Sequence, residues 1–133
     1  MTVADTSVVV AAFASWHERH DVARRALDGG GRLVEHCALE TYSVLTRLPP
    51  PHRAPGEVVL AFLEARFPEP FLRLSPAVYR DFLSALPEQA ISGGAAYDAL
   101  VAATAADNDA DLVSCDRRAA MLYERYRVRA RLL

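Results

Sequence analysis

The sequence predicts an α/β fold with a mostly parallel sheet, because short apolar strands alternate with helical patterns along the whole chain. The positions of Asp5, Glu40, Asp98 and Asp116 strengthen this prediction, since each follows a predicted strand or lies in the early turns of a predicted helix. In a parallel sheet such junctions share one edge, so distant acids can meet there. Two carboxylates about 4 Å apart repel by roughly 4 kcal/mol at an effective dielectric near 20. A cluster of four therefore indicates a cation site.

The first half of the chain shows two apolar strands and four helical patterns. Thr6 and Ser7 offer hydroxyl groups that can cap the helix after the first strand, and the glycine run from Gly29 ends the second helix. Apolar residues at every third place mark the third helix, and Pro55 is well placed to open the fourth. The predicted elements are strands over 2–4 and 32–34 and helices over 8–13, 16–27, 38–48 and 55–67.

The second half continues the alternation. Ser75 and Pro76 can start a helix that Pro87 closes, and Gly94 precedes an alanine-rich helix. On that helix we expect an inward face formed by Tyr97, Leu100, Val101 and Thr104. Alternating residues near the carboxyl terminus indicate an edge strand. The predicted elements are strands over 71–74, 112–114 and 127–132, and helices over 75–87, over 95–107 and from Asp116 to about Tyr126.

Length and composition indicate one folded domain over residues 1–133, with 52% hydrophobic and 24% charged residues. The net charge of −2 argues against general, high-affinity binding to a nucleic-acid backbone, although every basic residue is an arginine. The longest apolar run, Val8 to Ala14, is too short for a membrane span or a signal sequence, so we expect a cytoplasmic protein. Cys37 and Cys115 show no disulfide or zinc spacing, and we expect free, buried thiols.

Each acid also has an ordinary structural interpretation. Asp5 and Asp116 could cap the helices that follow them, Asp98 could complement a helix dipole, and Glu40 could be a solvated surface residue. Because Thr6 and Ser7 could cap the first helix without Asp5, the site interpretation gains weight. The four histidines are interpreted as ordinary polar residues of helix starts and loops: His17, His20, His36 and His52.

Four segments together resemble the successive motifs of PIN-domain ribonucleases, and most closely those of VapC-type toxins of prokaryotic toxin–antitoxin pairs. The segments appear in the family's order and extend over nearly the whole chain: Val3–Val10, Leu39–Leu48, Tyr97–Ala105 and Leu112–Arg118. The resemblance implies a three-layer α/β/α sandwich and an endoribonuclease held in check by a cognate VapB-type antitoxin. It also implies a homodimer, because relatives are commonly dimers.

Carried over to this sequence, the resemblance implies that Asp5, Glu40, Asp98 and Asp116 hold Mg²⁺ or Mn²⁺ for cleavage of RNA, leaving 5′-phosphate and 3′-hydroxyl ends. Hard divalent cations prefer carboxylate and water oxygens, which agrees with this role. The hydroxyl groups of Thr6 and Ser114 are candidates to orient the carboxylates or water, with ordinary strand and cap roles as the alternative.

The chain departs from the family pattern after its fourth acid. Many relatives place a further acid shortly after that position, whereas Arg117 and Arg118 follow Asp116 here. We therefore expect one tightly held ion, with a second recruited by the RNA phosphate. The two arginines could instead contact the RNA backbone.

An apolar helix face with Phe62 and Leu63 is the expected antitoxin groove, and with Val59 and Phe67 it also motivates the expected homodimer. Two alternatives remain open. A non-catalytic PIN-fold interaction domain would bind only a protein partner. A phosphohydrolase of the haloacid-dehalogenase kind also starts with an acid after its first strand, but it needs a second acid where this chain has Ser7.

Overall fold

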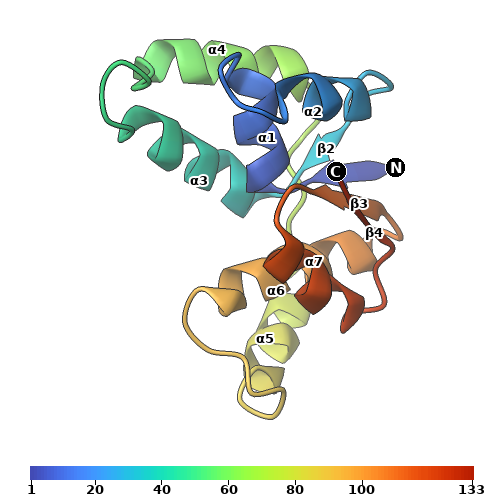
Figure 1. Cartoon of the computed structure of the whole chain (residues 1–133). Helices are drawn as coiled ribbons and strands as arrows, with labels where there is room; N and C mark the ends of the chain where they lie inside the picture. Colours follow the sequence, from blue (N-terminus) through green and yellow to red (C-terminus); the bar gives the residue numbers. More distant parts are fainter.

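A computed structural model describes residues 1–133 and contains four strands and seven helices (Figure 1). The strands are short, and a strand separates α2 from α3 and α6 from α7. In chain order the elements are β1 (Thr2–Ala4), α1 (Thr6–Phe13), α2 (His20–Ala26), β2 (Arg32–Leu33), α3 (Glu35–Thr46), α4 (Gly56–Arg66), α5 (Pro76–Ala85), α6 (Ala95–Asp107), β3 (Asp111–Ser114), α7 (Arg117–Glu124) and β4 (Ala130–Leu132).

The four strands form one parallel sheet in the order β2-β1-β3-β4. In Figure 1, α1 to α4 lie on one side of this sheet and α5 to α7 lie on the other. The predicted three-layer α/β/α sandwich with a parallel sheet is therefore confirmed. The chain leaves β1 toward β2 on one side and reaches β3 on the other, so the gap between β1 and β3 is the topological switch point of the sheet. Ligands of open α/β sheets bind at such points.

Several predicted boundaries differ from the structure. The helix expected over 16–27 begins only at His20, after a bent segment, and the strand expected over 71–74 is reduced to one bridge between Val34 and Leu72. The edge strand expected over 127–132 starts at Ala130, because Arg127 adopts a left-handed conformation with φ 59° that interrupts an extended run. These ends depend on tertiary pairing, which periodicity along the chain does not report.

The core lies around the two central strands and α1. Val3 and Leu112 have no exposed surface, and on α1 the residues Val8, Val9 and Ala11 are likewise fully buried. A helix buried nearly all round must have neighbours on several sides, and α1 packs against the sheet, α2 and α3. None of the helices has the length and hydrophobicity that crossing a membrane would require.

The apolar face of α4 is buried, which contradicts the expectation of an exposed partner groove. Val59, Leu63 and Phe67 are at most 4% exposed, and Phe62 packs edge-on against Phe13 with ring centroids 5.3 Å apart. The neighbouring layer of α1 and α3 covers this face, so the apolar stripe marks the core side of the helix. The groove assigned to Phe62 and Leu63, and the dimer argument based on them, are therefore wrong.

We predict that Leu63→Ala lowers the free energy of unfolding by about 2–5 kcal/mol, because it leaves a cavity in a packed core. The matched control is Leu60→Ala on the same helix, where the side chain is 50% exposed and the change should stay within about 0.5 kcal/mol. Urea denaturation followed by circular dichroism measures both. Equal, small effects would contradict the burial of Leu63.

Candidate metal-dependent active site

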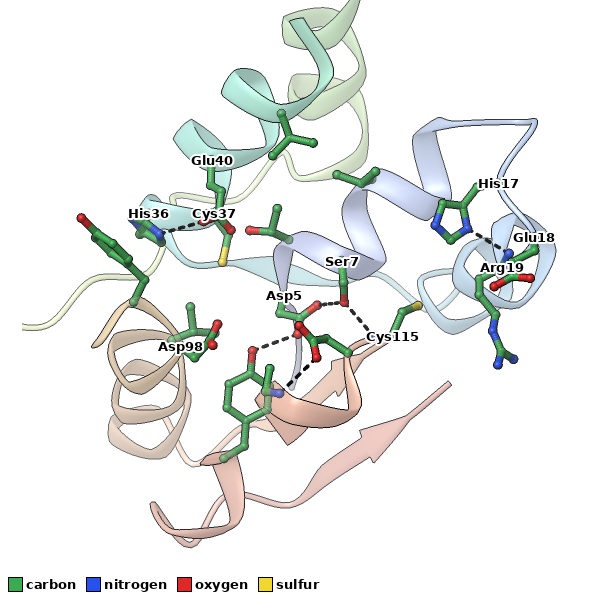
Figure 2. Close-up of a pocket in the computed structure, with 18 residues that line it drawn as sticks. Asp5, Ser7, His17, Glu18, Arg19, His36, Cys37, Glu40, Asp98 and Cys115 are labelled. Atoms are coloured by element: carbon green, nitrogen blue, oxygen red, sulfur yellow. Dashed lines mark hydrogen bonds and ion pairs between the residues drawn. The ribbon is translucent and has the colours of Figure 1, made fainter. Parts of the chain in front are cut away.

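The carboxyl ends of β1 and β3 lie side by side, and an acid follows each strand directly: Asp5 after β1 and Asp116 after β3. Glu40 lies in α3 and Asp98 in the first turn of α6. All four acids line one pocket with a volume of about 520 Å³. Figure 2 shows the labelled side chains of Asp5, Glu40 and Asp98 around this pocket. The structure thus brings together the four acids that the sequence analysis selected.

Asp5 is held by hydrogen bonds on both carboxylate oxygens. Its Oδ1 accepts from the Val8 backbone N–H at 3.2 Å and from the Ser7 hydroxyl, and its Oδ2 accepts from the Tyr123 hydroxyl at 2.9 Å. The side chain is only 4% exposed, and burial raises the pKa of this carboxyl while these hydrogen bonds oppose the rise. Asp5 is therefore the N-cap of α1, and the expectation that Thr6 and Ser7 cap this helix in its place is wrong.

A serine pair joins the two loops that follow β1 and β3. The Ser7 hydroxyl accepts from the Cys115 backbone N–H at 2.8 Å, and the Ser114 hydroxyl accepts from the Asp116 backbone N–H at 2.9 Å. The two hydroxyl oxygens are 3.5 Å apart. Ser114 therefore orients the Asp116 segment through its backbone, whereas the Thr6 hydroxyl is buried without a hydrogen-bond partner.

Sequence reasoning missed two residues that hold Asp5. Ser7 was interpreted only as a helix cap, although its position two residues after an acid at a strand end could have suggested a contact. Tyr123 lies 118 residues away from Asp5 in sequence, is 1% exposed and gives no local signal of this bond. Only the packing of α7 against the sheet brings it there.

Asp116 is both a helix cap and a member of the pocket. Its Oδ1 accepts from the backbone N–H groups of Arg118 and Ala119, at 2.9 and 3.2 Å, at the start of α7. The side chains of Arg117 and Arg118 are not part of the pocket wall, and both residues are exposed. The arginine that lines the pocket is Arg19, in the bent segment before α2.

Asp98 carries the clearest sign of electrostatic crowding. Partial burial raises its pKa to about 6, and the negative charges of Asp116, Asp5 and Glu40 contribute further, while His36 opposes the rise. Glu40 in turn has its Oε2 atom 3.5 Å from Nε2 of His36. The charges of the three other acids disfavour the ionisation of Asp98, and a bound cation would relieve that condition.

The donor set fits a hard divalent cation better than a soft one. All four acids offer oxygen, and Cys37 on the same wall remains a neutral thiol because burial raises its pKa to about 12. The acids do not form a compact, ready-made metal centre, since no three metal-binding side chains converge. The residues that could hold a cation are therefore present in one pocket, with space between them for water and substrate oxygens.

An aromatic pair borders the acidic pocket. The rings of His36 and Tyr97 are stacked with centroids 4.7 Å apart and planes 4° apart, and both residues line the pocket. Tyr97 is 55% exposed, so its predicted inward orientation is wrong, whereas Val101 and Thr104 on the same helix are buried as predicted. The first turn of α6 packs Ala95 and Ala96 on a second, smaller hydrophobic cluster, and Tyr97 lies on its exposed side beside the pocket.

Comparison with known proteins connects this pocket to a family. A family model described as PIN domain matches residues 2–125. The chain is 49% identical over 133 residues to Ribonuclease VapC40 of Mycobacterium tuberculosis, covering 100% of this chain and 99% of the relative. It is 38% identical over 122 residues to Ribonuclease VapC27 of Mycobacterium tuberculosis strain H37Rv, covering 91% and 88% of the two chains.

Among solved structures, the fold resembles that in the crystal structure of FitAcB from Neisseria gonorrhoeae. The TM-score is 0.63 at 18% sequence identity, with 98% of this chain and 96% of the other chain covered. At this level of identity the likeness supports the fold.

We predict that Asp98→Asn raises the melting temperature of the metal-free protein at about pH 7.5, by on the order of a few degrees. The folded-state pKa of about 6 lies above the ordinary 3.8, so ionised Asp98 destabilises the fold at neutral pH. That cost diminishes as the pH falls through 6 and is absent below 3.8. The gain should therefore shrink at about pH 4.5.

Thermal denaturation at the two pH values measures this effect, with chelator present. Asp81→Asn, at an exposed position of α5, is the matched control and should leave the melting temperature nearly unchanged. A gain for Asp98→Asn that is larger at the lower pH would contradict the electrostatic interpretation.

Proposed function

Because this chain belongs to the VapC ribonucleases of the PIN-domain family, we propose that it is a metal-dependent endoribonuclease that hydrolyses RNA phosphodiester bonds. The observation that carries the proposal is that four acids, from four separate segments, line one pocket at the switch point of the sheet. We further propose that the chain acts as a toxin, as a single domain over residues 1–133, in the cytoplasm.

The proposed cofactor is Mg²⁺ or Mn²⁺, held by Asp5, Asp98 and Asp116 with Glu40. When bound, the ion supplies Lewis-acid polarisation of the phosphodiester and activation of a water molecule. The protein's own contribution is to orient the carboxylates that would hold the ion. Ser7 and Tyr123 fix the carboxylate of Asp5, and the Ser114 hydroxyl fixes the segment of Asp116.

Proton balance is the second contribution of the protein. In the free protein Asp98 shares the pocket with three other acids and has a pKa of about 6, so a fraction of it is protonated near neutral pH. Cation binding favours the ionised form and releases that proton. Since Arg117 and Arg118 add no carboxylate after Asp116, we propose one tightly held ion, with a second arriving with the RNA phosphate.

The alternatives differ in what they require of the pocket. A haloacid-dehalogenase-like phosphohydrolase needs an acid at position 7, where the Ser7 hydroxyl instead donates to Asp5. A non-catalytic interaction domain is compatible with the lack of a compact three-ligand centre. Titration with Mn²⁺ separates it from the nuclease, because an interaction domain needs no metal.

We propose two assembly partners for the chain. A VapB-type antitoxin would present an Arg or Lys side chain to the acidic pocket in place of the cation. A homodimer would cover exposed apolar side chains of α3 and α5, where Leu39 is 70% exposed and Leu83 is 52% exposed. This region replaces the α4 face as the support for a dimer.

We predict that Asp5→Asn lowers Mn²⁺-dependent RNA cleavage by at least about 100-fold, because it removes a charge from the proposed metal-binding set. The fold should persist, since the amide oxygen can still accept from the Val8 N–H, the amide nitrogen can donate to the Tyr123 hydroxyl oxygen, and the loss of charge relieves repulsion. Cleavage of a fluorophore–quencher RNA after chelation and metal add-back measures the loss. Glu88→Gln, an exposed acid outside the pocket, is the control. Full activity of Asp5→Asn at saturating Mn²⁺ would contradict the assignment.

Sedimentation velocity tests both assembly proposals. We expect a dimer of the isolated chain at tens of micromolar, roughly the range in which weak symmetric interfaces associate, and a heavier species after addition of a small protein encoded by the adjacent reading frame. Observation of monomer alone at that concentration would argue against the homodimer. Absence of any complex with the adjacent gene product would argue against the antitoxin.

A further inference from the structure

The acidic pocket is poorly equipped to bind an RNA backbone by charge. Arg19 is the one arginine that lines it, against five acidic residues: Asp5, Glu18, Glu40, Asp98 and Asp116. Affinity for a phosphate backbone normally depends on Lys and Arg side chains that neutralise it. A bound divalent ion can offset part of this deficit at the phosphate that reacts. Contacts that do not depend on charge must then supply much of the remaining affinity for RNA.

Tyr97 is the aromatic side chain best placed for such a contact. It directly precedes Asp98 in the first turn of α6, lines the pocket and is 55% exposed. Tyr123, the other tyrosine of the pocket, is 1% exposed and donates to Asp5, so its ring is not accessible. Among the tyrosines of this pocket, Tyr97 is therefore the one whose ring is accessible to a substrate.

The orientation of the Tyr97 ring is fixed from one side by His36. The two rings are parallel within 4° at a centroid distance of 4.7 Å, so the imidazole covers one face of the phenol. His36 lies on α3, and its Nε2 atom is 3.5 Å from Oε2 of Glu40, one turn further along the helix. Figure 2 shows His36 and Glu40 on the same border of the pocket, with Asp98 below them. The stack thus presents a pre-oriented aromatic surface next to the acids.

From this arrangement we infer that Tyr97 is a substrate-binding residue on which a base of single-stranded RNA stacks, close to the bond that is cleaved. The inference rests on the proposed ribonuclease function and specifies how that site holds its substrate. Every base has a π-face, so a tyrosine platform holds unpaired nucleotides with little dependence on sequence and without positive charge. His36 acts as a positioning residue, because it supports the ring and does not itself offer a free face.

The test pairs a protein change with an RNA change. Tyr97→Leu removes the aromatic ring, and an abasic nucleotide placed in turn at each position around the mapped cleavage site removes the base. With intact RNA, Tyr97→Leu should raise KM and lower kcat/KM by about 5- to 100-fold, with a smaller effect on kcat. With the abasic nucleotide at the stacking position, wild type and Tyr97→Leu should have equal kcat/KM values. The two changes remove the same contact. Tyr97→Phe keeps the ring and should recover most of the loss.

Two controls separate this contact from other effects. Tyr79→Leu changes a tyrosine that is 44% exposed on α5 and lies outside the acidic pocket, and it should leave kcat/KM unchanged. Mn²⁺ affinity measured by calorimetry should be the same for Tyr97→Leu and wild type, since the ring donates no ligand to the acids.

A binding measurement distinguishes failure of this inference from failure of the proposed function. Fluorescence anisotropy with Ca²⁺ compares a mixed-sequence oligoribonucleotide with an abasic ribose-phosphate oligomer of equal length, so it needs no cleavage. Wild type should bind the intact oligomer about 5- to 100-fold more tightly than Tyr97→Leu does, and the two proteins should bind the abasic oligomer equally. That result without any cleavage by the wild type would keep the stacking site and overturn the nuclease. Cleavage by the wild type with no effect of Tyr97→Leu on KM or binding would overturn the stacking site alone.

Discussion

The buried carboxylate of Asp5 is the constraint on which both the fold and the pocket depend. It caps α1 through the Val8 N–H and receives the hydroxyl groups of Ser7 and Tyr123, so it ties the first strand to the last helix. A carboxylate that is 4% exposed would be unfavourable without these partners. Each of the partners also fixes the direction in which the carboxylate faces the pocket. The hydrogen bonds that make the burial of this charge tolerable are therefore the same ones that orient the site.

Asp98 lacks such partners, and its ionised form lowers the stability of the protein in the absence of a cation. Asp98 has fewer favourable contacts, and its raised pKa reflects burial and the charges of Asp116, Asp5 and Glu40. Binding sites are places where proteins commonly retain such unfavourable arrangements. The parallel sheet favours this crowding. The strands β1 and β3 both end at the switch point, and the acids Asp5 and Asp116 follow them directly. The rigid central strands keep the acids near one another even when no ion neutralises them.

Local patterns predicted most of the element order and the four acids, because both depend on periodicity and on positions next to strands. They failed where a neighbour from elsewhere in the chain decided the outcome. The apolar stripe of α4 was visible in the sequence, but its direction toward α1 and α3 was not, so Phe62 and Leu63 were assigned to the wrong side. Tyr97 fitted the helical repeat of buried residues, although in the structure its side chain is 55% exposed beside the pocket. The Tyr123 hydroxyl bond to Asp5 depends on the docking of α7, which no local pattern specifies.

The same geometry explains how a chain with a net charge of −2 could act on RNA at all. A strongly basic surface would bind any nucleic acid, because most of its affinity would come from contacts with the backbone. That affinity would fall as the salt concentration increases. An acidic pocket would instead repel the backbone except where the proposed divalent ion offsets its negative charge. Duplex RNA keeps its bases stacked inside the helix and offers mainly that backbone, whereas an unpaired strand offers exposed base faces as well. On the proposed function, a pocket that combines acids with the Tyr97 and His36 stack would select single-stranded RNA, because it offers little positive charge to the backbone of a duplex and an aromatic surface to an unpaired base.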